Sequence, residues 1–191
     1  MSIVDLVLSQ TTRFAKSIIT KPETKHICYI HTPPRFLWNF SGEKTNWFFE
    51  PFFSKLRQFD LISSKRVDYW IAGSKNCQER LKKIYAVESK VLYPFVDLED
   101  YNPIGSFNGS YYLMIGRLNK YKKVEVALKA FKNSGRNLKI VGTGPLINKL
   151  KETVSGNIEI LGAVREELLK SLLAVCKGLI IVGEEDFGMT A

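Results

Sequence analysis

Short apolar runs alternate with segments of helical periodicity along most of the chain. The runs have the length of buried strands and lie at residues 3–8, 26–30, 69–72, 90–93, 111–115, 138–141, 158–161 and 179–182. Apolar residues recur at helical spacing between them, at residues 74–85, 124–132, 146–153 and 166–175. Repeated β-α units of this kind predict an α/β protein with parallel sheets and right-handed crossovers.

A turn-rich segment interrupts the alternation near the middle of the chain. Residues 94–110 are rich in Pro, Asp, Asn and Gly, and the β-α series starts afresh at Tyr111. We therefore predict two incomplete parallel-sheet domains, over residues 1–94 and 111–191, joined by a linker over residues 95–110.

Residues 33–66 have no strand signal and are dense in aromatic side chains. Charged residues are interleaved with these aromatics, which are Phe36, Trp38, Phe40, Trp47, Phe48, Phe49, Phe52, Phe53 and Phe59. Two interpretations remain open. The segment forms helices that pack on the sheet, or it presents an exposed platform to an acceptor or a membrane surface.

Composition limits the class of protein. The 191 residues are 45% hydrophobic, which suffices for one large domain or two small ones. Three scattered cysteines (Cys28, Cys77, Cys176) and only two histidines indicate a reduced cytosolic protein without a metal cluster.

The net charge of +9 favours an anionic partner. Because the surplus is spread along both halves of the chain, we expect no nucleic acid among the partners. No apolar run reaches the length of a transmembrane helix. The sequence predicts a cytoplasmic protein, and a peripheral place on the inner face of a membrane remains open.

Candidate site residues lie directly after the predicted strands. They are His31, Gly116, Arg117, Lys122, Gly142, Gly144, Gly162, Glu184 and Glu185. The carboxyl ends of parallel strands meet at one edge of a sheet. We therefore expect cations, glycine turns and an acidic pair around a common cleft.

The residue types at this edge suit a phosphorylated sugar. Arg117 and Lys122 could clamp a diphosphate, the first through a bidentate fork and the second as a point charge, although surface cations have the same pattern. The turn Gly142-Thr143-Gly144-Pro145 predicts a helix start with Pro in the first turn and N–H groups free for an anion. It matches neither the dinucleotide fingerprint nor the P-loop. Glu185 lacks a third carboxylate for a metal site, and sugar hydroxyls are its better ligand.

The order of these motifs resembles the donor-binding domain of family-4 retaining glycosyltransferases. The motifs are Gly116-Arg117-Leu118, Tyr121-Lys122-Lys123, Val141-Gly142-Thr143-Gly144-Pro145, Asn157-Ile158-Glu159-Ile160-Leu161-Gly162 and Glu184-Glu185-Asp186-Phe187-Gly188. Upstream, residues 28–33 with Arg35, residues 66–74 and residues 91–97 resemble the acceptor domain of the same family and its passage between domains. The resemblance covers nearly the whole chain.

This resemblance implies a GT-B fold, in which two Rossmann-like domains, here incomplete, face a cleft. It implies a nucleoside diphosphate sugar as donor substrate, without metal or other cofactor. In the family pattern Arg117 and Lys122 hold the donor diphosphate, Glu185 binds sugar hydroxyls and His31 lies beside the transferred sugar, so these four are the expected catalytic residues. The further donor-binding residues that it implies are Gly116, Gly142, Gly144, Val164, Phe187, Gly188, Met189 and Thr190.

The sequence departs from the family pattern at both ends. The second Glu of the family's E-x7-E motif would fall two residues beyond Ala191, and the Gly-rich first loop would precede Met1. The resemblance thus implies an internal fragment of a retaining hexosyltransferase, and we expect weak or no activity from the fragment by itself.

The expected reaction moves a hexose such as mannose from a nucleoside diphosphate sugar to a glycan or lipid-linked acceptor. Two alternatives remain open. One is a non-catalytic remnant of such an enzyme. The other is a basic interaction module for anionic lipid or nucleic acid.

Overall fold

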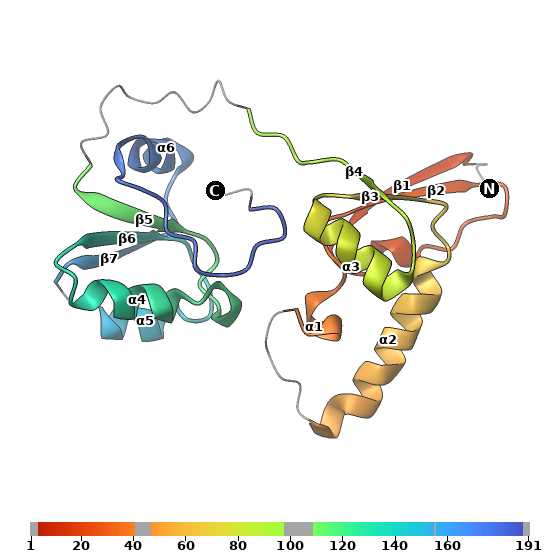
Figure 1. Cartoon of the computed structure of the whole chain (residues 1–191), viewed down its shortest axis with the longest axis horizontal. Helices are drawn as coiled ribbons and strands as arrows, with labels where there is room; N and C mark the ends of the chain where they lie inside the picture. Colours follow the sequence, from red (N-terminus) through yellow and green to blue (C-terminus); the bar gives the residue numbers. More distant parts are fainter. Residues whose placement is uncertain (1–3, 41–46, 98–108, 155, 189–191) are drawn as a thin grey trace. The chain divides into compact units, whose positions relative to one another are not determined.

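The computed structural model describes residues 4–40, 47–97, 109–154 and 156–188. The chain divides into two compact units, unit 1 over Met1–Phe95 and unit 2 over Val96–Ala191. Each unit has a parallel sheet of its own (Figure 1). Most of the predicted linker, residues 98–108, lies outside the described residues.

Unit 1 contains a four-stranded parallel sheet in the order β1-β2-β3-β4. Its strands are β1 (Leu6–Thr11), β2 (Lys25–Ile30), β3 (Tyr69–Ala72) and β4 (Lys90–Val91). Its helices are η1 (Ala15–Ser17), α1 (Arg35–Trp38), η2 (Trp47–Phe49), α2 (Glu50–Ser64) and α3 (Lys75–Tyr85). The aromatic segment is therefore mostly helical among its described residues.

The first strand lies three residues later than the sequence predicted. The apolar run at residues 3–8 suggested a buried strand, but Leu6 and Leu8 are exposed and the inward positions of β1 are Ser9 and Thr11. Ser9 Oγ lies 2.8 Å from Nε2 of the fully buried His26 on β2. The prediction was wrong because β1 is an edge strand whose inward side chains are polar, so hydrophobicity does not mark it.

The last strand of unit 1 is shorter than predicted. The structure places β4 at Lys90–Val91 only, although the backbone N–H of Leu92 still donates to Ala72 O at 3.0 Å. Leu92 and Tyr93 are largely exposed, so the apolar residues at these two positions do not mark a buried strand.

Helices cover one face of this sheet. Cys28 and Ile30 of β2, with Trp70 and Ala72 of β3, are buried in a core that also holds Cys77, Leu81 and Tyr85 of α3. Helix α3 begins after Ser74, whose Oγ accepts a hydrogen bond from the N–H of Cys77 at 3.0 Å. This cap satisfies one of the free donors at the start of the helix.

A buried polar cluster joins four helical elements below this core. The Asp60 carboxylate on α2 pairs with Lys16 Nζ from η1, and both side chains are fully buried. Trp38 Nε1 donates to Asp60 Oδ2 at 2.9 Å, and the Tyr85 hydroxyl donates to the same oxygen at 2.6 Å. This cluster could not be predicted from the sequence, because Lys16 and Asp60 are 44 positions apart and no motif connects them.

Tyr85 should make the stability of unit 1 depend on pH in the alkaline range. Burial and the neighbouring Asp60 carboxylate raise the pKa of its hydroxyl above the ordinary value of 10. Above about pH 10 the unfolded chain loses this proton and the folded chain retains it, so stability falls as pH rises. We expect the urea midpoint to fall more steeply between pH 9 and 11 in the wild type than in Tyr85→Phe. Equal slopes would show that Tyr85 does not couple folding to its proton.

Unit 2 contains a three-stranded parallel sheet in the order β5-β6-β7. The strands are β5 (Tyr111–Ile115), β6 (Asn137–Val141) and β7 (Ile158–Gly162). The helical elements are η4 (Lys120–Lys122), α4 (Val124–Lys132), α5 (Ile147–Thr153) and α6 (Glu166–Val175). Helices α4 and α5 cover one face and α6 covers the other (Figure 1), so both faces of this sheet have a core.

The segment 179–182, predicted as a strand, is reduced to a single bridge. Leu179 pairs in parallel with Leu113, through the bonds Leu113 N to Gly178 O (3.0 Å) and Ile180 N to Leu113 O (2.7 Å). Leu113 uses these groups on the edge of β5 that faces away from β6. The chain therefore runs outward through β6 and β7 and then returns to the other side of β5, which creates a topological switch point beside β5.

Candidate functional site

Three loops of unit 2 meet at the carboxyl ends of its strands. Residues 116–123 follow β5, residues 142–146 follow β6, and residues 183–188 follow the bridge at Leu179. The first and third of these loops flank the switch point. In open α/β sheets ligands bind beside such a switch point, outside the carboxyl ends of the strands.

The structure brings two of the predicted site residues into direct contact. Lys122, at the end of η4, donates from Nζ to Oε1 of Glu185, which lies 63 positions further along the chain. The two side chains are only 16% and 24% exposed, so solvent screens their attraction less than that of a surface pair. An ion pair at the switch point therefore fixes a cation and a carboxylate side by side.

The two glycines after β6 allow the loops to touch. A Cβ on Gly142, whose φ is +141°, would lie 1.9 Å from the backbone O of Gly116. A Cβ on Gly144 would lie 2.4 Å from Leu118 O. The same two loops are joined by Leu118 N, which donates to Thr143 O at 2.8 Å. These glycines thus have a packing role within the chain, whatever they contact in a ligand.

Gly183 is a further residue of this edge that was not among those predicted from the sequence. A Cβ at this position would lie 2.9 Å from Tyr121 O, so the loop that carries Glu185 also packs closely on the loop that carries Lys122. A glycine placed between an apolar run and an acidic pair is the signal that could have identified it.

The predicted helix start after Gly144 differs in the structure. Helix α5 begins at Ile147, and Pro145 precedes it rather than occupying its first turn. The N–H of Leu146 donates to Leu118 O at 3.1 Å, and that of Ile147 donates to Gly144 O at 3.1 Å. The prediction of free N–H groups is wrong at these two positions, because a contact with the loop after β5 uses the first and a turn within the same loop uses the second.

The remaining predicted residues of unit 2 are spread around this edge. The Arg117 side chain is exposed, and within the described residues its guanidinium has no hydrogen bond or ion pair. Val164 is half-buried against the core below α6, whereas Phe187 is largely exposed. Gly188 has a φ of +83°. Met189 and Thr190 lie outside the described residues.

His31 belongs to unit 1 and follows β2 directly. Its Nε2 lies 2.9 Å from Nε2 of Gln10, and its ring meets the Tyr29 ring edge-on with centroids 5.0 Å apart. Gln10 and Tyr29 thereby orient the ring of this histidine.

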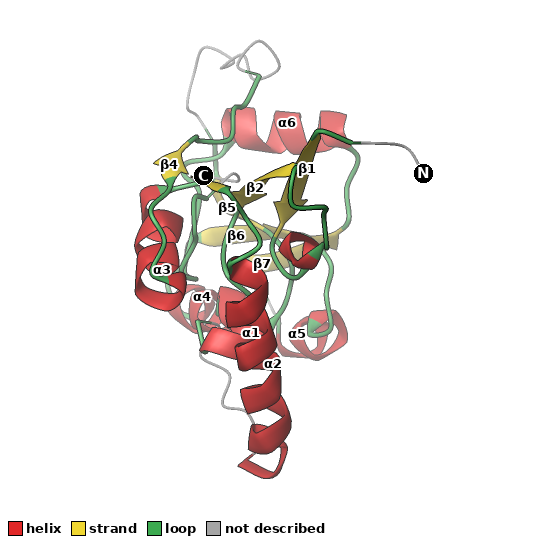
Figure 2. Ribbon diagram, turned by 90° about the vertical axis from the view of Figure 1, so that its right-hand side faces the viewer, coloured by secondary structure: helices red, strands yellow, loops and turns green. Residues whose placement is uncertain are grey.

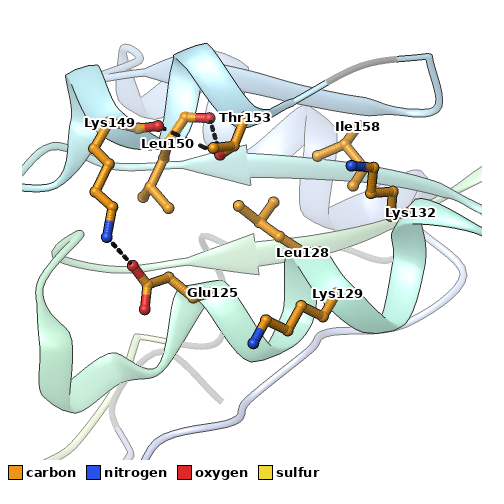
Figure 3. Close-up of a pocket in the computed structure, with 8 residues that line it drawn as sticks. All are labelled: Glu125, Leu128, Lys129, Lys132, Lys149, Leu150, Thr153 and Ile158. Atoms are coloured by element: carbon orange, nitrogen blue, oxygen red, sulfur yellow. Dashed lines mark hydrogen bonds and ion pairs between the residues drawn. The ribbon is translucent and has the colours of Figure 1, made fainter.

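A separate hollow of about 370 Å³ lies between α4 and α5 (Figure 3). Leu128, Leu150 and Ile158 form its apolar floor, and lysines stand around its rim. Across this rim Lys149 Nζ donates to Glu125 at 2.9 Å, and this bond lowers the pKa of the Glu125 carboxyl. Ile158 is the first residue of β7, so the hollow lies away from the strand ends that carry the candidate site.

Metal ligands, membrane spans and free thiols are further features that bear on the class of protein. Among the described residues no group of three or more His, Cys, Asp or Glu side chains is placed to hold a metal ion. No helix in the same part of the chain is long and apolar enough to cross a bilayer. The three cysteines are buried free thiols, and burial raises the pKa of Cys28.

Comparison with known proteins relates the chain to glycosyltransferases. It is 28% identical over 142 residues to the uncharacterized glycosyltransferase MJ1178 of Methanocaldococcus jannaschii, which covers 72% of this chain and 40% of that protein. The chain therefore spans less than half the length of this relative. No family model matches the chain.

Solved structures of glycosyltransferases share the fold. Sucrose-phosphate synthase from Thermosynechococcus elongatus matches with a TM-score of 0.72 at 13% identity, over 98% of this chain and 52% of that one. Anabaena HepE in complex with UDP matches with a TM-score of 0.64 at 15% identity, over 87% and 50%, and it also matches as a complex with UDP and glucose. These likenesses confirm the predicted GT-B type of α/β fold, with two parallel sheets.

Proposed function

We propose that this chain is part of a glycosyltransferase that takes a sugar from a nucleoside diphosphate donor. The observation that carries the proposal is the Lys122–Glu185 pair at the switch point of unit 2, with the exposed Arg117 on the same loop as Lys122. The similarity to MJ1178 and the GT-B fold support it. The finer proposal, which rests on the motif resemblance, is retaining transfer of a hexose such as mannose to a glycan or lipid-linked acceptor.

Each residue has a role that its chemistry supports. Arg117 and Lys122 would stabilise the negative charge that develops on a leaving diphosphate, which requires no metal ion. Glu185 would accept hydrogen bonds from sugar hydroxyls while it keeps Lys122 oriented. His31, whose ring Gln10 and Tyr29 orient, would lie beside the transferred sugar in the family arrangement.

The pairing of Lys122 with Glu185 predicts that replacing each residue has a different effect on ligand binding. Lys122→Met should weaken binding of UDP or GDP by about 10- to 150-fold, as expected for loss of a charge-assisted hydrogen bond of about 1.5–3 kcal/mol. Glu185→Gln should leave binding of the free nucleoside diphosphate unchanged or tighter, because Lys122 loses its competing carboxylate. It should weaken binding of the nucleotide sugar. Isothermal titration of the full chain with each ligand measures these differences.

Lys151→Met is the matched control, because Lys151 is an exposed lysine of α5. It should bind both ligands like the wild type. Equal losses in Lys122→Met and Lys151→Met would show that only general charge matters, which favours the basic interaction module. A wild-type chain that binds no nucleoside diphosphate would favour the non-catalytic remnant.

A further inference from the structure

Helix α2 of unit 1 exposes large apolar side chains on its outward side, whereas its fully buried residues are polar, although the half-buried Leu61 also packs against the core. Its buried residues are Asp60, Ser63 and Ser64. Its exposed side includes Phe52, which is 60% exposed, together with Phe59 and Ile62. A helix on the surface of a globular protein normally has the opposite arrangement.

The exposed aromatic surface continues into η2, which immediately precedes the helix. Trp47 is 82% exposed and Phe48 is 69% exposed, and Phe49 is more than half exposed. We call these six residues of η2 and α2 the aromatic face: Trp47, Phe48, Phe49, Phe52, Phe59 and Ile62. Positions 48, 52, 59 and 62 recur at helical spacing and therefore share one side of the helix.

The inward side of α2 explains why the helix keeps this orientation. Asp60 is held by Lys16, Trp38 and Tyr85, which come from three other elements. If α2 turned so that its exposed aromatic side chains became buried, Asp60 would move away from the inside and the buried Lys16 would lose its carboxylate partner. The Trp38 indole and the Tyr85 hydroxyl would lose their acceptor as well. The polar cluster therefore holds the aromatic face toward the outside of unit 1.

The shape of the aromatic face indicates what kind of surface it contacts. Its rings pack on one another edge-to-face, with centroids 6.3 Å apart for Trp47 and Phe48 and 5.5 Å apart for Phe48 and Phe49. The first turns of α2 extend past α1 and α3 in both views of unit 1 (Figures 1 and 2). Projecting rings of this kind suit a deformable medium better than a protein surface, which would need matching pockets.

The charge beside the aromatic face is basic on balance, because Glu50 in the first turn of α2 is paired with Arg57 and the neighbouring lysines are in excess. Lys55 lies between Phe52 and Phe59 on the same side of the helix, and it is exposed. Lys65 follows the helix and is also exposed, and the whole chain carries a net charge of +9. Aromatic rings with neighbouring lysines are the chemistry of helices that lie in the interface of an anionic bilayer.

We propose that the aromatic face of η2 and α2 is a membrane-contact surface that inserts into the interface of an anionic lipid bilayer. Trp47, Phe48 and Phe52 enter the boundary between headgroups and acyl chains, and Lys55 stays at the level of the lipid phosphates. This surface belongs to unit 1 and does not depend on the donor site proposed for unit 2.

Vesicle flotation of the full chain tests this surface. The chain should float with vesicles of phosphatidylcholine and phosphatidylglycerol, and less with phosphatidylcholine alone. The double variant Phe48→Ser/Phe52→Ser should lower the bound fraction on anionic vesicles by at least tenfold. The control Leu92→Ser/Phe95→Ser removes two exposed apolar side chains elsewhere in unit 1 and should bind like the wild type. Circular dichroism and UDP titration of each variant check that the fold and the donor site are retained.

Tryptophan fluorescence gives a second, local readout. Trp47 is highly exposed, whereas Trp70 is buried and the Trp38 indole is bonded to Asp60. Anionic vesicles should therefore shift the emission to shorter wavelength, and Trp47→Phe should abolish this shift while most of the binding persists.

Three results would overturn the proposal. One is flotation that the aromatic double variant leaves unchanged, and another is a Trp47 emission that vesicles do not move. The third is a dimer in analytical ultracentrifugation that the double variant dissociates, because the face would then join two copies of the chain. None of these results bears on UDP binding by unit 2, so failure here is distinct from failure of the proposed function.

Discussion

Asp60→Ala is expected to lower the free energy of unfolding of unit 1 by about 3–5 kcal/mol, the usual cost of removing one partner from a buried ion pair. Lys16 would keep its charge without a carboxylate in a fully buried position. The Trp38 indole and the Tyr85 hydroxyl would also lose their acceptor. Urea denaturation of the full chain, followed by tryptophan fluorescence, measures the loss.

Two further variants separate this effect from a general one. Lys16→Met/Asp60→Leu removes both charges together and should recover much of the lost stability, because no unpaired charge remains. Lys82→Gln breaks an exposed ion pair with Glu88 and should change stability little. If Asp60→Ala costs no more than Lys82→Gln, the buried cluster does not hold η1, α1 and α3 together.

Gly142→Ala is expected to destabilise unit 2 and to weaken binding at the candidate site. The new Cβ would lie 1.9 Å from Gly116 O, a backbone atom that a rotamer change cannot move. Strain of about 1–3 kcal/mol from the positive φ adds to an overpacking cost of about 1–3 kcal/mol. Separation of the loops would also displace Lys122 from Glu185. Thermal unfolding and UDP titration measure the two effects.

Gly135→Ala is the control for the strain that a positive φ causes without any steric contact. Gly135 also has a positive φ, of +66°, but nothing lies within 4 Å of the position of its Cβ. This variant should lose only about 1 kcal/mol and bind UDP like the wild type. A loss at Gly142 no larger than that at Gly135 would mean that the contact between the loops does not constrain the site.

Most strands of the two sheets could be predicted from apolar runs. The predictions for β2, β3, β5, β6 and β7 match the structure to within one residue at each end. These strands have neighbours on both edges or a helix-covered face, so their side chains are apolar. The run at residues 179–182 has the same composition, yet it forms only a bridge, because strand length depends on the paired neighbour as well as on composition.

The candidate site was partly predictable for a topological reason. Parallel strands bring their carboxyl ends to one edge, so residues in the loops that follow strands, such as Lys122 and Glu185, could be expected to meet. The side of β5 on which the Leu179 segment returns could not be predicted from the pattern. Nor could the use of the Leu146 amide by the neighbouring loop at Leu118, because that bond depends on the close approach that glycines permit.

The sequence by itself determined the α/β class and most of the strands, because hydrophobic periodicity is a local property of the chain. The GT-B type of fold followed from the resemblance of its motifs to family-4 glycosyltransferases. Only the tertiary structure decided which side of α2 faces the inside of unit 1. The aromatic side chains alone would predict that their side is buried, but Asp60 occupies the inside, where it pairs with Lys16. The same holds for the Lys122–Glu185 pair. A contact between side chains 63 positions apart is set by how the strands are ordered in the sheet, and no local pattern records that order.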